Sequence, residues 1–300
     1  MAKKNRAKSN TLGVSKFGVV DVIIYVVLGL IGLCMVLPFL YVVAGSFATE
    51  KELTEKAFFI IPTVWSLNAY KYAINTAHIL RGLRNSICLT LLGTLTCMLF
   101  SLTFAYPLSK QHFRGRNWIM NLVIFTMLFS GGLIPTYLVV TSYGLRDSWW
   151  ALILIGAISP FNMVIIKNFF QGLPVELDEA SYMDGANDFQ IFWKVALPLS
   201  KPVIASISLF YGVGFWNDYF NAMIYLESSE KFPIQIMLRS IILQSSTIAD
   251  TVTEYDINGT PPDKAVKMAC TVIATVPILI VYPFVQKYFT QGVMVGAVKG

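Results

Sequence analysis

The residues with the clearest chemical potential lie in a short polar stretch, residues 174–198, between two long apolar segments. The stretch reads PVELDEASYMDGANDFQIFWKVALP, and its first half contains four carboxylates and no lysine or arginine. Carboxylates of this kind form charge-assisted hydrogen bonds with basic side chains. A helix that only rests on a membrane surface normally carries a basic polar face. The pattern therefore favours a docking site for another protein. The four acids are Glu176, Asp178, Glu179 and Asp184.

Two short helices joined by a bend are the structure that this stretch predicts. Pro174 suits a first helical turn, and Gly185 suits the left-handed residue that ends a helix. Asn187 or Asp188 is placed to cap a second helix, which should stop at Pro198. We expect that second helix to carry an apolar stripe. Its members are Phe189, Phe192, Trp193 and Ala196.

A second candidate site combines aromatic rings with amide and carboxylate groups. Rings stack against the faces of sugars, and sugar hydroxyls need paired donors and acceptors. The cluster is therefore a candidate for the substrate pathway or for the surface that meets a binding protein. An aromatic belt at the membrane interface, with polar groups at a helix end, is the alternative. The cluster comprises Trp216, Asn217, Asp218, Tyr219 and Asn221.

No pattern in the sequence indicates a catalytic site. The sequence contains no GxxxxGK[ST] phosphate-binding motif, so we do not expect this chain to hydrolyse ATP itself. His78 and His112 have no nucleophile nearby and are interpreted as solvated surface residues. The four cysteines have neither CxxC nor metal-ligand spacing. We therefore expect no catalytic residue, no metal site and no cofactor bound by this chain.

The elements that must position these residues are predicted to be membrane-spanning helices. The chain is 55% hydrophobic and only 13% charged, whereas charged residues make up about a quarter of a soluble domain. Segments of about twenty apolar residues can cross a bilayer, and in lipid they must be helical. The sequence thus predicts an all-α polytopic membrane protein with six transmembrane helices. The spans are 22–43, 86–108, 118–140, 149–166, 202–226 and 268–288.

The distribution of basic residues predicts the orientation of these spans. Short cytoplasmic segments are rich in lysine and arginine. Five such residues precede the first span, and Lys110, Arg114 and Arg116 occupy the short connection between spans two and three. Both termini and residues 174–198 are then cytoplasmic. The first apolar run is too long for a signal peptide. The net charge of +6 reflects this inner-face bias, so we expect no nucleic-acid partner.

Glycines and prolines interrupt several predicted spans. In the third span they are Gly131, Gly132 and Pro135. Small residues allow helices to approach closely, and prolines bend helices by freeing backbone carbonyls. Tight packing and bent, pathway-lining helices both account for this composition.

The acid-rich stretch resembles the Glu-Ala-Ala loop of ABC importer permeases. Ser181 replaces the second alanine of the family pattern and Val195 replaces its isoleucine, and both changes preserve shape. The C-terminal GVMVGAVKG is similar to the tail of the maltose-type inner-membrane subunit. Together with the six spans, these features resemble the carbohydrate-importer branch across nearly the whole chain. The matching positions are Glu179, Ala180, Ser181, Gly185, Val195, Leu197 and Pro198.

This resemblance implies a type I importer fold, with residues 1–300 forming a single transmembrane permease domain in a prokaryotic cell membrane. It implies a second homologous permease subunit, two ATP-binding cassette ATPases that use ATP and Mg²⁺, and an extracellular or periplasmic solute-binding protein. The cargo would be an oligosaccharide or polysaccharide fragment.

The resemblance also implies roles for single residues. Glu179 would pair with a basic residue of the ATPase, and the small residues beside it would shape the docking surface. Leu197 and Pro198 would fix the exit into the fifth span. The tail would contact the ATPases through Gly296, Lys299 and Gly300.

An ion-coupled secondary transporter of a small polar solute is the alternative function. Such proteins place ionisable residues near the membrane midplane. Asp218 is the candidate here, but it is a lone carboxylate toward the outer end of its span. Ion-dependent uptake by the purified chain alone would favour this alternative.

Overall fold

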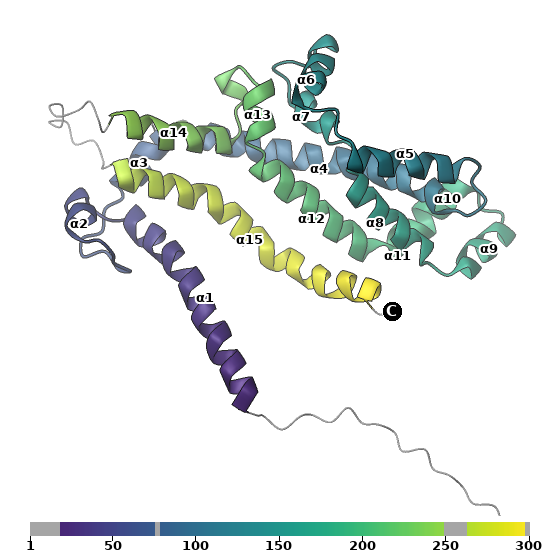
Figure 1. The fold of residues 1–300 in the computed structure, drawn as a ribbon, viewed down its shortest axis with the longest axis horizontal. Helices are drawn as coiled ribbons and strands as arrows, with labels where there is room; N and C mark the ends of the chain where they lie inside the picture. The colour runs from purple at the N-terminus through teal and green to yellow at the C-terminus, as the bar shows by residue number, and fades with distance from the viewer. Residues whose placement is uncertain (1–18, 76–78, 249–262, 298–300) are drawn as a thin grey trace, which may run out of the picture.

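The computed structural model describes residues 19–75, 79–248 and 263–297, and these residues form helices and connecting loops without a strand. Figure 1 shows a long bundle in which α4, α8, α12 and α15 run roughly along the long axis. The helices are α1 (Val19–Ser46), α2 (Glu50–Glu55), α3 (Asn68–Asn75), α4 (Ile79–Ser109), α5 (Arg116–Leu128), α6 (Leu133–Ser142), α7 (Trp149–Ile155), α8 (Pro160–Gln171), α9 (Val175–Met183), α10 (Asp188–Ile191), η1 (Phe192–Ala196), α11 (Leu197–Leu199), α12 (Lys201–Asn217), α13 (Phe220–Tyr225), η2 (Ser229–Lys231), α14 (Ile234–Ile248) and α15 (Asp263–Ala297).

Within the described residues, three helices are long and apolar enough to cross a membrane alone, namely α1, α4 and α15. Three further pairs of helices pass the same test together, each pair being bent at a short break. The protein is therefore an all-helical membrane protein with up to six candidate spans, in agreement with the predicted fold class. The first, second and sixth predicted spans fall within α1, α4 and α15.

The third and fourth predicted spans are each divided into two helices. Between α5 and α6 the chain bends by 117°, and between α7 and α8 it bends by 53°. At the first break Gly132 has φ +85°, a left-handed conformation that costs glycine little. At the second break Ser159 caps α8, with Pro160 in the first helical turn. Of the two interpretations of the third-span glycines, the structure favours bending.

The fifth predicted span also differs from a single helix. Its helix, α12, ends at Asn217, where Asp218 takes an extended conformation, and the chain continues into α13. At its other end α12 meets the run Asp188–Leu199 at 81°. Residues 202–226 are thus covered by two helices, and the acid-rich stretch leads into α12 through a sharp bend.

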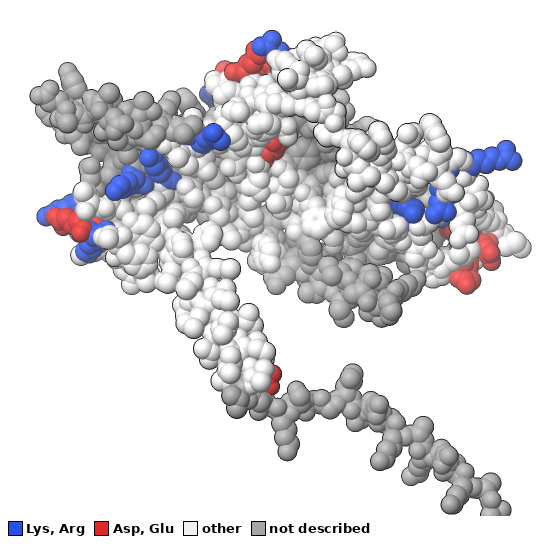
Figure 2. Space-filling view, in the orientation of Figure 1, with Lys and Arg blue, Asp and Glu red and all other residues white. Residues whose placement is uncertain are grey.

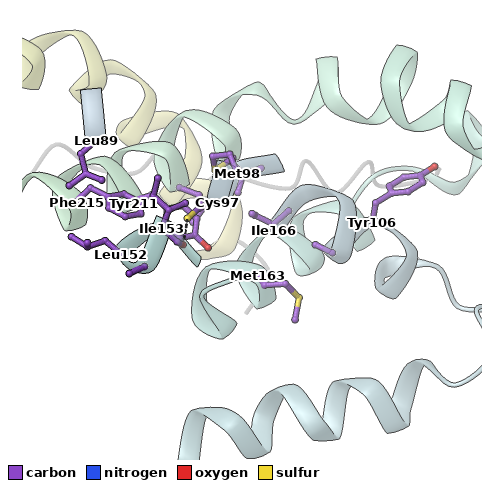
Figure 3. Packing of buried hydrophobic residues seen from close by; sticks show 14 of the residues in the cluster. Leu89, Cys97, Met98, Tyr106, Leu152, Ile153, Met163, Ile166, Tyr211 and Phe215 are labelled. Atoms are coloured by element: carbon purple, nitrogen blue, oxygen red, sulfur yellow. Dashed lines mark hydrogen bonds between the residues drawn. The ribbon is translucent and has the colours of Figure 1, made fainter. Parts of the chain in front are cut away.

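Two apolar cores hold the bundle together. The larger lies between α4, α7, α8 and α12 and includes Leu89, Met163 and Ile207. Figure 3 shows its side chains converging from these helices. The smaller core joins the end of α1 to α2, α3 and α15. Most of α1 lies apart from the bundle, with its apolar side chains exposed in the isolated chain (Figure 1).

The break between α7 and α8 leaves backbone groups that need partners within an apolar environment. The hydroxyl of Tyr211 accepts a hydrogen bond from the backbone N–H of Ser159 at 2.9 Å, and it shares a second with Ser101 Oγ at 2.7 Å. The Cys97 thiol donates to the Gly156 carbonyl at 3.3 Å. Side chains of α4 and α12 therefore satisfy the groups that the break would otherwise leave unpaired.

Polar loops at the end opposite α9 are fixed by two buried or half-buried carboxylates. Asp147 accepts hydrogen bonds from the backbone N–H groups of Glu227 and Ser228, each at 3.0 Å, and from Lys231 Nζ at 2.6 Å. These donors, led by Lys231, hold the pKa of Asp147 well below its usual range. Glu52, 5% exposed, bonds to Lys56 and Thr63, which lower its pKa to about 2.

Candidate functional site

The acid-rich stretch forms a projecting pair of helical segments at one end of the bundle. Its first helix, α9, buries no residue, and its tip residue Met183 is 88% exposed. Figure 1 places α9 at the right-hand end of the molecule, and Figure 2 shows acidic side chains there. We call residues 174–199 the docking module. A helix without a buried face is poorly stabilised by its own chain, which is consistent with a surface that meets another protein.

The bend inside the docking module is fixed by local interactions. Gly185 has φ +80°, which confirms the predicted left-handed end of α9. Asn187 caps α10 in a reciprocal capping box with Gln190, so the first of the two predicted caps is confirmed. The Tyr182 hydroxyl donates to the Asp188 carboxylate and thereby joins α9 to α10. That hydrogen bond is the main cause that raises the pKa of Tyr182 to about 12.

The second half of the docking module is anchored in the larger core. Phe192 lies 4.9 Å from Tyr106 of α4, measured between ring centroids, and the ring of Phe170 in α8 completes the group. Phe192 and Ala196 are buried, but Phe189 and Trp193 are exposed, so only half of the predicted apolar stripe faces the core. The physical reason is that the buried face is built on Ile191, Phe192 and Ala196, so it is rotated from the predicted stripe and leaves Phe189 and Trp193 at its edge.

One ion pair ties the first helix of the module to the bundle. Lys110, at the end of α4, pairs with Asp178 of α9. The Lys110 ammonium also lies 4.6 Å from the centre of the Tyr106 ring, within the range of a cation–π interaction. Of the four acidic residues in this stretch, Asp178 is therefore the one that pairs with the bundle. The sequence placed Asp178 and Lys110 on the same side of the membrane but did not predict their pairing.

Glu179 is left available on the exposed surface. Within the described residues its carboxylate forms no hydrogen bond or ion pair. Ser181 uses its hydroxyl to bond the Leu177 carbonyl at 2.6 Å, so it behaves as a small residue, as does its neighbour Ala180. Ser181 and Gly185 line a cleft of about 320 Å³ between α9 and the segment 190–195, with Lys194 on its far side. The carboxylate that lines this cleft is Asp184, whereas Glu179 is not among the lining residues and lies on another side of α9.

Leu197 and Pro198 lie at the entry to α12, where the sequence placed them. Pro198 does not end the helical run but lies within α11, and the chain turns at the buried Ser200. Leu197 packs against the larger core, whereas Pro198 is exposed. Because proline has no N–H, Pro198 removes one backbone donor next to the π-helical turn.

The second candidate cluster is divided by the structure. Trp216 is 6% exposed and donates to the Ala274 carbonyl at 3.3 Å, so it packs between α12 and α15. Asp218 accepts bonds from the backbone and side-chain amides of Asn221, each at 3.1 Å, and so stabilises the start of α13. Asn217 bonds the Val213 carbonyl at 3.0 Å.

Arg239 of α14 is a residue that the sequence analysis missed near this cluster. Its guanidinium lies 4.4 Å from the centre of the Tyr219 ring. No local pattern links residues 219 and 239, so only the fold reveals the contact. Among the described residues no group of three or more His, Cys, Asp or Glu side chains could hold a metal. Gly296 lies within α15, whereas Lys299 and Gly300 fall outside the described residues.

Comparisons with known proteins agree with this architecture. Residues 97–295 match the family described as binding-protein-dependent transport system inner membrane component. Protein LplC of Bacillus subtilis (strain 168) is 52% identical over 298 residues, covering 98% of this chain and 100% of that protein. The polygalacturonan/rhamnogalacturonan transport system permease protein YtcP of the same organism is 50% identical over 280 residues, covering 93% of this chain and 98% of that protein.

A solved structure shows the same fold. It is the crystal structure of a bacterial ABC transporter involved in the import of the acidic polysaccharide alginate. One of its chains superposes with a TM-score of 0.83 at 33% identity, covering 90% of this chain and 96% of that chain.

An all-helical membrane bundle with a projecting helix pair on its surface defines, with these matches, a permease subunit of an ABC importer. The chain belongs to the family of binding-protein-dependent transport system inner membrane components, and it is a multi-pass protein of the bacterial inner membrane. The predicted resemblance to the carbohydrate-importer branch is confirmed. Permease subunits of this kind bind no cofactor, and ATP is used by the ATPase subunits of the importer.

Proposed function

We propose that this chain forms half of the pathway of an importer for oligosaccharides or polysaccharide fragments. It pairs with a second homologous permease subunit, two ATPases dock on the cytoplasmic side, and an external solute-binding protein delivers the cargo. The substrate class is supported by similar proteins that are named for the transport of polygalacturonan, rhamnogalacturonan or alginate. Both termini and the docking module face the cytoplasm, as the basic residues of the short connections predict.

The observation that carries the proposal is the exposed Glu179, unpaired within the described residues, on a module whose second half is anchored in the larger core. Its partner is a basic residue of the ATPase, and the small residues Ser181 and Gly185 give the docking surface a separate cleft on another side of α9. Leu197 and Pro198 set the angle at which the module joins α12. Asn217, Asp218, Tyr219 and Asn221 stay candidates for the pathway, whereas the burial of Trp216 supports a packing role. Gly296, Lys299 and Gly300 stay candidates for an ATPase contact by the tail.

The substitution Glu179→Arg tests the docking role in the assembled complex. Reversing a charge that pairs with a cation should weaken retention of the ATPase by about tenfold or more. Membrane insertion should not change, because Glu179 makes no contact within the described part of the bundle. Glu55→Arg is a matched control, since Glu55 is an exposed glutamate on α2 at the opposite end.

Charge reversal of the partner residue in the ATPase should restore part of the lost binding. Wild-type ATPase retention together with wild-type uptake in the Glu179→Arg complex contradicts the docking role. Ion-driven uptake by this chain without an ATPase contradicts the importer function and supports the secondary-transporter alternative.

A further inference from the structure

A second cleft opens at the end of the bundle opposite the docking module. Its volume is about 520 Å³, and it lies where the start of α4 meets the start of α7 and η2. Under the proposed orientation this end faces the outside of the cell, where cargo arrives. We call it the outer cleft. Its lining residues are Arg81, Arg84, Asn85, Trp149, Glu230 and Lys231.

The walls of the outer cleft are held in place by buried hydrogen bonds. Asn85 is 2% exposed, and its amide donates to the carbonyls of Glu230 at 2.7 Å and Phe232 at 3.1 Å. The indole N–H of Trp149 donates to the Lys231 carbonyl at 3.0 Å. These bonds link α4, α7 and η2, which are far apart in the sequence. The cleft is therefore preformed, and binding to it needs little ordering of the chain.

Two arginines supply unneutralised positive charge to the outer cleft. Arg81 and Arg84 are one helical turn apart on α4, both are exposed, and neither forms an ion pair or a hydrogen bond within the described residues. Lys231, in contrast, is neutralised by Asp147 at 2.6 Å. Glu230 adds one carboxylate to the lining. Figure 2 shows several basic side chains around this end of the molecule.

This combination of groups matches the chemistry of an acidic sugar. A guanidinium binds a carboxylate through two parallel hydrogen bonds, which a neutral hydroxyl cannot reproduce. Trp149 is half-buried against the larger core, and the part that lines the cleft gives an apolar surface for a sugar ring. The Glu230 carboxylate accepts hydrogen bonds from hydroxyl groups. The cleft therefore contains separate groups for the charge, the ring and the hydroxyls of one uronate unit.

We propose that the outer cleft binds a uronate unit of an acidic oligosaccharide, with Arg81 and Arg84 holding its carboxylate. This inference rests on the proposed function and narrows its substrate class from carbohydrates to acidic ones. Two similar proteins are named for polygalacturonan and alginate transport, and both polymers consist of uronates. The cleft is then a specificity site of the permease itself, separate from the site in the binding protein.

The test uses the complete importer reconstituted with its binding protein, and it compares trigalacturonate with neutral galactotriose. Arg81→Gln and Arg84→Gln should each raise the trigalacturonate concentration for half-maximal uptake by about tenfold, the loss of one charge-assisted contact. Uptake of galactotriose and basal ATP hydrolysis should not change. Lys71→Gln, an exposed lysine of α3 outside the cleft, is the matched control.

Direct binding gives a second measurement that does not depend on the binding protein. The complex without its binding protein, in lipid nanodiscs, should bind trigalacturonate more tightly than galactotriose, and the preference should fall as salt is raised. The Arg84→Lys variant should retain part of the preference for trigalacturonate over galactotriose. If the arginine variants leave trigalacturonate uptake and binding unchanged, or weaken both sugars equally, the inference is wrong.

The uptake assay distinguishes a failure of the acidic specificity from a failure of the carbohydrate-importer function. A wild-type importer that carries galactotriose but not trigalacturonate overturns the acidic specificity and leaves the carbohydrate function intact. An importer that carries neither sugar nor any other carbohydrate overturns both.

Discussion

Breaking the ion pair between Lys110 and Asp178 should weaken the docking of the ATPase by loosening α9, while Glu179 and the residues that line the cleft stay unchanged. The two side chains are only 18% and 28% exposed, so the pair is stronger than a fully solvated one, which contributes about 0.2–1 kcal/mol. The contact of Lys110 with the Tyr106 ring adds about 0.5–1 kcal/mol. Together these two interactions stabilise the position of α9 by about 1–2 kcal/mol. Losing that free energy should lower the affinity of the permease for the ATPase by about 5- to 30-fold.

The measurement is a double-mutant cycle on the dissociation constant of the ATPase from the permease in nanodiscs. Lys110→Met and Asp178→Asn should each weaken binding within that range, and the double variant should be no weaker than either single variant. Arg114→Met is the matched control, because Arg114 is exposed in the same connection without a described partner. Strictly additive losses would mean that the two residues act separately, and the positioning role would then be refuted.

Two predictions concern stability, measured by thermal unfolding of the purified protein in detergent. Tyr211→Phe keeps the ring but removes the acceptor for the Ser159 N–H, and it should cost about 1–3 kcal/mol, whereas Tyr143→Phe, at a site 77% exposed, should cost almost nothing. Equal unfolding temperatures for these two variants would contradict the role assigned to the hydroxyl. Glu52→Gln should lower the unfolding temperature at pH 7. Because the folded pKa of Glu52 is about 2, below its ordinary value of about 4.3, this difference is full above pH 4.3 and disappears as the pH falls toward 2. A difference that stays constant from pH 7 to pH 2 would show that the charge of Glu52 is unimportant.

The sequence was sufficient for the features that depend on composition and local chemistry. Hydropathy identified the apolar segments that form α1, α4 and α15, and the Gly185 and Asn187 signals defined the bend of the docking module. The mean hydropathy of a segment does not show where the chain bends, however. It therefore predicted α5 with α6, and α7 with α8, as single spans. The Ser159-Pro160 pair is a helix start that could have revealed the second break.

The features that stayed hidden depend on contacts between distant residues. The face of the second helical segment that packs on the core includes Ile191, and no local pattern shows that Phe189 and Trp193 lie at the edge of that face. The burial of Trp216 depends on the small residues of α15, more than fifty positions away. Arg81 and Arg84 carry no motif, and their importance appears only when α7 and η2 close the cleft around them.

The aromatic group around Phe192 has a mechanical consequence. Its three rings belong to η1, α4 and α8, and they are in close contact. Because packed interiors have low compressibility, a sideways displacement of η1 is transmitted to both helices instead of being absorbed in the gap between them. A force applied to η1 would therefore act on α4 and α8 together.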